Sequence, residues 1–174
     1  MSRLRLMPVE LFTTGSRLAG EIETHHIHIR DVLNDATKGY LIVHRASLAS
    51  LLNLKAPPVS SQETRINKDA IILAIPRKVR GTTAMLKQRI LHSRLGRNEY
   101  RVLLEVYPFQ VVGNLHVIGS FDVQEAIFKL DETFISLSRA TVTYLPVPSV
   151  AFAVQEIVVN RDYGQILCAN PSLS

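Results

Sequence analysis

Apolar residues recur along the chain in short alternating or continuous runs, and these runs predict many short β-strands. The stretches VELFTTGSRLAGEI and VYPFQVVGNLHVIGSF are β-rich, and each contains a glycine where a turn is expected. An alternating strand follows in both parts of the chain, with Leu41, Val43 and Leu137 predicted on one face. Further strands are expected in RINKDAIILAI and AFAVQEIVVN, after loops rich in Pro and Ser. The pattern therefore predicts a mainly β fold.

Two stretches between these strands have helical spacing instead. IRDVLND and VQEAIFK carry apolar residues three and four positions apart, which predicts a short helical turn in each. Asp122 is suited to cap the second turn. Asp31 and Glu125 occupy matching places, where a negative charge favours the helix dipole, so we interpret them as capping residues and not as a catalytic carboxylate pair.

The chain also repeats its own pattern. LIVHRASLASL resembles ISLSRATVTYL, and Ile27–Leu51 aligns with Phe121–Leu145 without a gap. On either side, GSRLAG resembles GNLHVIG and RINKDAII resembles VVNRDYGQ, in the same order. Such ordered matches predict an internal duplication. We expect two tandem small antiparallel β-barrel or sandwich units, residues 1–76 and 102–174, joined by a basic helical connector over residues 77–101.

The order of parts in each unit resembles that of the Sm-like small barrels. In that family a segment of the type V-x-L-xx-G-xxxx-G-x-L precedes an Asp-xx-Met-Asn-like turn, an apolar strand and a segment resembling Ile-Arg-Gly-xx-Ile. Here VELFTTGSRLAGEI is similar to the opening, DVLND to the turn and RINKDAII to the last segment. The chain departs from the family in the inserted helical turn and in Lys68-Asp69, which replaces Arg-Gly. The resemblance implies an Sm-like or SH3-like unit; the unit also resembles one carried singly by uncharacterised bacterial proteins, which implies no activity.

Basic residues are concentrated in the connector. Eight of the chain's 20 basic residues lie between Arg77 and Arg101, with Glu99 as the one acid among them. Thr82 or Thr83 is expected to cap a helix that runs to about Leu95. A basic segment of this kind is an electrostatic footprint for phosphate groups, and the predicted contacts to RNA or DNA are Arg77, Lys78, Arg80, Lys87, Arg89, Arg94 and Arg97. The alternative is a solvated connector whose counter-charges are the two slightly acidic units.

The stretch HHIHIR is the candidate for metal chemistry. On a strand, His26 and His28 would point to one face and converge on an ion. No motif places a third ligand beside them or beside His25, and Ser120 and Asp122 stand at the matching positions of the second copy. We therefore favour a structural or surface role for the histidines and predict no metal site.

The sequence contains no nucleophile elbow, P-loop, dinucleotide fingerprint or zinc cluster, so we predict no enzyme and no cofactor. Arg45 and Arg139 recur at one place in both copies and are expected to bond carbonyls or carboxylates such as those of Asp69 and Asp162; a ligand clamp is the alternative. Cys168 is the single cysteine, which excludes an internal disulfide, and its apolar neighbours predict that it is buried.

Two functional hypotheses follow from these observations. The first is a non-enzymatic binding protein that contacts RNA or DNA through the connector. The second is an assembly or scaffold protein that binds itself or a partner protein through sheet edges. Apolar runs such as AIILAI are far shorter than the roughly 20 residues that cross a bilayer, and the chain is expected in the cytoplasm.

Overall fold

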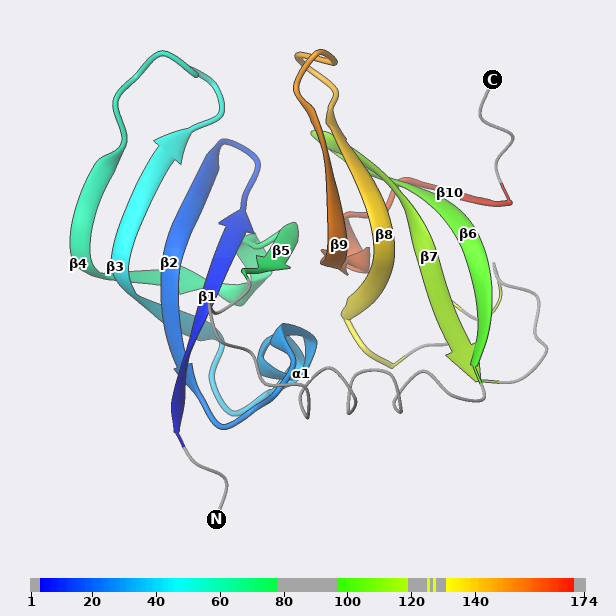
Figure 1. Cartoon of the computed structure of the whole chain (residues 1–174), viewed down its shortest axis with the longest axis horizontal. Helices are drawn as coiled ribbons and strands as arrows, with labels where there is room; N and C mark the ends of the chain where they lie inside the picture. Colours follow the sequence, from blue (N-terminus) through cyan, green and yellow to red (C-terminus); the bar gives the residue numbers. More distant parts are fainter. Residues whose placement is uncertain (1–3, 78–96, 119–124, 126, 128–130, 171–174) are drawn as a thin grey trace.

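The structure is a computed structural model, which describes residues 4–77, 97–118, 125, 127 and 131–170. Its described part is mainly β, as the alternating pattern predicts, with one short α-helix (Figure 1). The elements are, in chain order, β1 (Arg5–Phe12), β2 (Ser16–Thr24), α1 (Ile29–Asn34), β3 (Tyr40–Ser50), β4 (Val59–Asn67), the 3-10 turn η1 (Lys68–Ala70), β5 (Leu73–Pro76), β6 (Arg97–Val106), β7 (Phe109–Ile118), β8 (Phe134–Tyr144), β9 (Ala151–Asn160), the 3-10 turn η2 (Arg161–Tyr163) and β10 (Ile166–Ala169).

All ten strands belong to one antiparallel sheet in the order β10-β6-β7-β8-β9-β5-β1-β2-β3-β4. The sheet is not closed into a barrel, which corrects the expectation of small barrels. The physical reason is the partner of β5: on one side it pairs with β1, and on the other it pairs with β9 and not with β4. To close the first five strands into a barrel, β5 would have to pair with β4. It pairs with β9 instead and so joins the first five strands to the last five.

The first half of the sheet (residues 4–77) and the second half (residues 97–170) contain backbone hydrogen bonds at matching places. Their strand orders, β5-β1-β2-β3-β4 and β10-β6-β7-β8-β9, correspond strand by strand. The N–H of Arg77 donates to Pro8 O at 2.9 Å, as the N–H of Asn170 donates to Arg101 O at 2.7 Å. The links from Ile72 N to Phe12 O and from Gln165 N to Glu105 O match in the same way, at 2.8 and 2.9 Å. By place in the sheet, β10 is the counterpart of β5, and β4 is the counterpart of β9.

Each of the two hydrophobic clusters formed by the described residues draws side chains from both halves. The cluster inside the first half includes Phe134 and Val158 of the second half, which are 4% and 0% exposed. The cluster inside the second half includes Leu73 and Ile75 of β5. Between these two residues, Ala74 faces the other cluster. Because successive side chains of a strand point to opposite faces, β5 is buried on both sides and contributes to both cores.

Each half has an irregularity at a glycine of its second strand. The register of β2 against β3 shifts between Ala19 and Glu21, around Gly20, and the register of β7 against β8 shifts around Gly113. On the neighbouring strands, Arg45 and Arg139 both have φ of 48°, in the left-handed region that few non-glycine residues adopt. Such bulges bend a strand and increase its twist, which is how a sheet of this width curves around two cores.

Several local predictions can be compared directly with these elements. Leu41, Val43 and Leu137 are buried on one face of their strands, which confirms the predicted alternation. The stretch IRDVLND forms α1, whereas most of VQEAIFK, including the cap Asp122, lies outside the described residues. The strand predicted in RINKDAIILAI is split by η1 into the end of β4 and β5.

Candidate interaction surfaces

The two outermost strands of the sheet, β4 and β10, lie far apart on opposite sides of the molecule (Figure 1). Within the described part of the chain, β4 pairs only with β3, and β10 pairs only with β6. The first residues of β4 are exposed, and its sequence VSSQETRIN is mostly polar. An edge of this kind presents unpaired backbone N–H and C=O groups, which another strand can pair with.

The junction of β5 and β9, which we call the seam, shows what this sheet does when two such edges meet. Leu73 lies opposite Val159, and Ala74 lies opposite Val158. All four residues are 0% exposed. Beyond the last pair, the N–H of Asn160 donates to Ile72 O at 2.9 Å. The seam thus combines backbone pairing with complete burial of the side chains at its centre.

Polar side chains add hydrogen bonds across the seam. Asn160 is 2% exposed, and its Nδ2 donates to Ile71 O at 2.9 Å. The side chain of Asn34, at the end of α1, donates to Phe134 O and accepts from Phe134 N, at 2.9 and 3.0 Å. The hydroxyl of Tyr163 donates to Asp69 O at 2.8 Å. These amides and this hydroxyl fix one register between the halves, because each bonds a particular backbone group.

The free edges differ chemically from the seam. Arg65 of β4 is exposed, and its guanidinium lies 4.4 Å from the centre of the Tyr40 ring. At the matching places in the second half, Arg65 is replaced by Val158 and Tyr40 by Phe134.

On β10, Cys168 is exposed, so the prediction of a buried cysteine is wrong. Its apolar neighbours indicate a strand correctly, but β10 is an edge strand that pairs with no second strand among the residues that the structure describes.

The predicted phosphate-binding residues fall mostly outside the described part of the chain, namely Lys78, Arg80, Lys87, Arg89 and Arg94. Arg77 follows β5 and forms an ion pair with Glu10, which Arg17 also contacts. Burial alone would raise the pKa of Glu10, but the hydrogen bonds and charges of these two arginines outweigh it and hold the pKa below its usual value. Arg97 begins β6 and is half-buried. Of the predicted phosphate contacts, Arg77 therefore forms an ion pair with Glu10 of β1.

The histidine stretch does not form the strand on which His26 and His28 could converge on a metal ion. β2 ends at Thr24, whose hydroxyl accepts a hydrogen bond from His26 N at 2.9 Å, and the chain turns there into α1. His26 Nε2 lies 3.3 Å from a carboxylate oxygen of Asp35, and His28 is the residue before the helix. The side-chain oxygen of Thr24 therefore ends the strand before the histidines can alternate on it. Among the described residues, no group of three His, Cys, Asp or Glu side chains is arranged to hold a metal ion.

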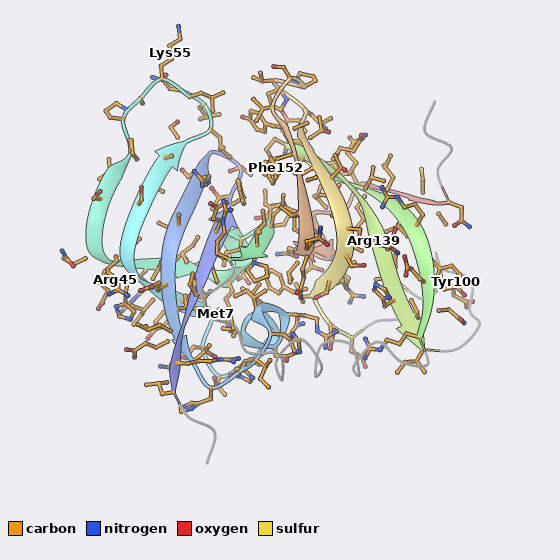
Figure 2. All side chains as sticks on the ribbon, viewed as in Figure 1. Met7, Arg45, Lys55, Tyr100, Arg139 and Phe152 are labelled. Atoms are coloured by element: carbon orange, nitrogen blue, oxygen red, sulfur yellow. The ribbon has the colours of Figure 1, made fainter. Side chains whose placement is uncertain are left out.

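The matched arginines bind carboxylates, but not the predicted ones. Arg45 forms an ion pair with Glu21, and Arg139 forms one with Glu99 (labelled arginines in Figure 2). Glu21 lies on β2, which is next to the strand of Arg45, and Glu99 lies on β6, which is separated by β7 from the strand of Arg139. The predicted carboxylates, those of Asp69 and Asp162, do not form these ion pairs. The two arginine side chains are exposed, so these pairs contribute little to stability in water.

Comparison with known proteins returns no match: the chain corresponds to no protein-family model, no curated protein and no solved structure. None of the helices in the described residues combines the length and the apolar character needed to cross a membrane.

Proposed function

We propose that this protein is a non-enzymatic assembly protein whose copies join head to tail, with β10 of one copy pairing with β4 of the next. The observation that carries the proposal is the seam. It pairs β5 with β9 inside the molecule, and the strands at the matching places of the two halves, β10 and β4, are the ones left at the free edges. The proposal includes the interpretation that the halves are tandem units.

The seam supplies a register for the proposed contact. Placing β10 where β5 stands, and β4 where β9 stands, sets Ile166 opposite Ile66 of the next copy and Leu167 opposite Arg65. One step further, Cys168 faces Thr64. Asn67 then occupies the place of Asn160, with its backbone N–H directed at Gln165 O.

The proposed contact is weaker than the seam. Arg65, with Tyr40 beneath it, stands where the seam has Val158, and its charge resists burial beside an apolar strand. β10 is four residues long, so backbone hydrogen bonds provide most of the attraction. We therefore expect a reversible, concentration-dependent association that ends in a ring if the rotation between copies closes and in a filament if it does not.

A single engineered cysteine tests the register, because Cys168 is the only cysteine of the chain. In the seam, the pair Asn160–Ile72 is hydrogen-bonded, so the antiparallel alternation makes the pair matching Thr64–Cys168 a closely spaced, non-hydrogen-bonded one. Such pairs bring Cβ atoms close enough for a disulfide. Thr64→Cys should therefore give disulfide-linked oligomers under mild oxidation, seen on a non-reducing gel.

Ser61→Cys is the matched control. Ser61 lies on the same strand and is more exposed than Thr64, but it is beyond the reach of four-residue β10. The control and the wild type are expected to form at most dimers through Cys168. If Thr64→Cys cross-links no better than Ser61→Cys, and sedimentation velocity shows a monomer at all concentrations, the proposed assembly is wrong.

The concentration of positive charge in residues 77–101 supports a second candidate function, binding of RNA or DNA through phosphate contacts. Labelled single-stranded RNA and duplex DNA would be titrated at several salt concentrations against the wild type and a variant with Arg89, Arg94 and Arg97 changed to Ala. A steep salt dependence that flattens in the variant supports this candidate. Absence of binding at low salt removes it and leaves the basic segment as a connector.

A further inference from the structure

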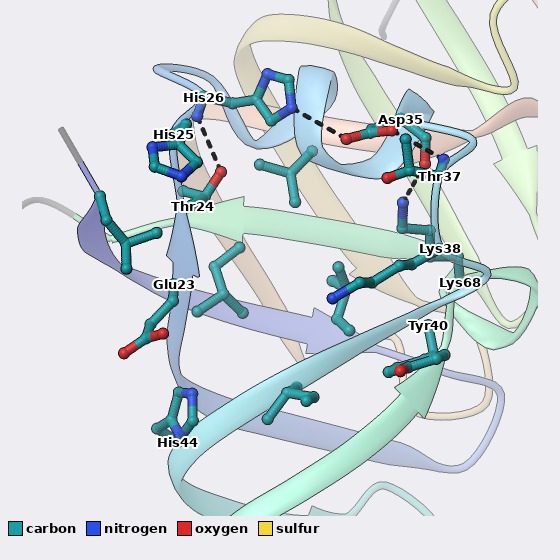
Figure 3. A pocket seen from close by; sticks show the side chains of 15 residues that line it. Glu23, Thr24, His25, His26, Asp35, Thr37, Lys38, Tyr40, His44 and Lys68 are labelled. Carbon is teal, nitrogen blue, oxygen red and sulfur yellow. Dashed lines mark hydrogen bonds and ion pairs between the residues drawn. The ribbon is translucent and has the colours of Figure 1, made fainter. Parts of the chain in front are cut away.

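A pocket of about 390 Å³ opens in the first half, where the end of β2, the start of β3 and the segment after α1 meet (Figure 3). Its apolar wall includes Ile22, Val32 and Leu41, all of which are at least nine-tenths buried. The volume suits a small organic molecule, since ligand pockets in proteins begin at about 300 Å³. The strand residues that the proposed assembly sets opposite β10, Thr64 to Asn67, do not line the pocket, although Tyr40, which lies beneath Arg65, does.

The most unusual group in its lining is the side chain of Lys68, which is 7% exposed. Its Nζ donates to Asp35 O at 2.5 Å. An ammonium group carries three donors, and no second acceptor for Lys68 is found among the described residues. Desolvation lowers the pKa of Lys68, while the charge of Asp35 partly opposes this effect. A buried cation with donors to spare is a group that an anion would stabilise.

The second half shows which part of this arrangement is structural. Arg161 stands at the place of Lys68, directly after the last residue of β9, and its Nη1 donates to Ile127 O at 2.9 Å. A cation that bonds a carbonyl near the helical turn is thus common to both halves. Asp35, His26 and the neighbouring Lys38 belong to the first half alone, and they surround the pocket.

The carboxylate of Asp35 is already engaged and does not neutralise the Lys68 ammonium directly. One oxygen accepts from Thr37 N at 2.9 Å, and the other lies 3.3 Å from His26 Nε2 (dashed lines in Figure 3). The hydrogen bonds of Thr37 and His26 lower the pKa of Asp35 to about 2, so the group is charged at neutral pH. Lys38 and His44 add donors to the lining, and Glu23 is the one further acid in it.

We propose that this pocket binds a small carboxylate with an apolar body, its carboxylate on Lys68 and Lys38 and its body against Ile22, Val32 and Leu41. A carboxylate can accept from the donors of the Lys68 ammonium that no acceptor among the described residues engages, and charge-assisted hydrogen bonds of this kind are about twice as strong as neutral ones. The apolar wall favours a ring or short chain over a fully polar anion, because a polar body would lose its hydration there.

The experiment is a titration of the ¹⁵N-labelled full chain with benzoate, followed by amide chemical shifts. Benzoate should move the signals of Thr37, Lys38 and Tyr40, and inorganic phosphate should move them much less at the same concentration. Lys68→Met keeps most of the length of the side chain without its charge and should weaken benzoate binding roughly tenfold or more, as loss of a charged hydrogen bond predicts. Lys55→Met, in the β3–β4 loop far from the pocket (Figure 2), should leave binding unchanged.

Because Lys68 also bonds Asp35 O, its variant is first checked for a native amide spectrum. If it fails to fold, Lys38→Gln tests the same claim, since Lys38 is exposed and holds no core position. The proposal is overturned if benzoate moves no signal around the pocket, if phosphate binds as tightly as benzoate, or if a folded Lys68→Met or Lys38→Gln variant binds benzoate like the wild type.

Discussion

The close approach of β2 to β3 at Gly20 predicts a large effect from a very small substitution. A Cβ built at Gly20 would lie 2.5 Å from a Val43 methyl carbon and 2.7 Å from the backbone oxygen of His44. The second contact is with backbone and cannot be relieved by a side-chain rotation. Overpacking of this kind costs about 1–3 kcal/mol, and the reduced freedom of the unfolded chain returns only about 0.4–1 kcal/mol. Gly20→Ala should therefore lower the free energy of unfolding by about 1–2 kcal/mol.

For a chain of this length, a loss of about 1–2 kcal/mol corresponds to a fall in Tm of roughly 2–8 °C, measured by circular dichroism or calorimetry. Gly39→Ala is the control, because a Cβ there meets no atom within 4 Å and should change stability by less than about 0.5 kcal/mol. Gly113→Ala should fall between the two, since its nearest contacts are side-chain carbons of Leu137 and Ala140 at 3.0 to 3.3 Å. Equal Tm values for Gly20→Ala and Gly39→Ala would refute the close approach of the two strands.

Three further predictions concern individual side chains. Phe134→Ala should cost about 3–5 kcal/mol in denaturant unfolding because the ring fills the core of the other half, and half-buried Phe152→Ala should cost clearly less. Arg139→Val should destabilise the fold by about 1–2 kcal/mol and Arg139→Gly should not, because φ of 48° suits glycine and strains a β-branched residue; equal Tm values would contradict this. The pKa of Glu10 is lower in the folded state, so its contribution is present above its usual pKa of 4.5 and is lost as the pH falls below it. Glu10→Gln should therefore flatten the dependence of stability on pH between about pH 5 and 3, and an unchanged slope would exclude Glu10 as its source.

Local periodicity predicts most of the strands, but it assigns the start of β6 at residues 97–101 to the connector, and it does not identify the strand that joins the halves. The alternation around Leu41 and Val43 identifies an inward face because burial selects apolar residues at every second position. The same reasoning does not say which edge a strand pairs with. The run AIILAI did carry a signal, since apolar residues on both faces indicate a strand covered on both sides, as β5 is at the seam.

The candidate sites were harder to predict, for reasons that lie in single contacts. A metal site at His26 and His28 would require both residues on one strand, but β2 already ends at Thr24, whose hydroxyl accepts a hydrogen bond from His26 N. In the sequence, Lys68 differs from its surroundings only as a departure from an Arg-Gly pair, because its burial and its hydrogen bond to Asp35 O exist only in the folded chain. Charge runs and motifs are visible in a sequence, whereas a buried cation beside a pocket is a property of the packed chain.

The shared cores also decide how the molecule unfolds. Phe134 and Val158 complete the cluster of the first half, and Leu73 and Ile75 complete that of the second, so separating the halves would expose apolar side chains on both sides of the seam. Two independent units would unfold in two steps, each with its own Tm. We expect instead one cooperative transition in calorimetry, with the calorimetric enthalpy equal to the van't Hoff enthalpy. Gly20→Ala and Gly113→Ala, one in each half, should both move that single transition. Two transitions, each shifted by only one of the variants, would mean that the seam does not couple the halves.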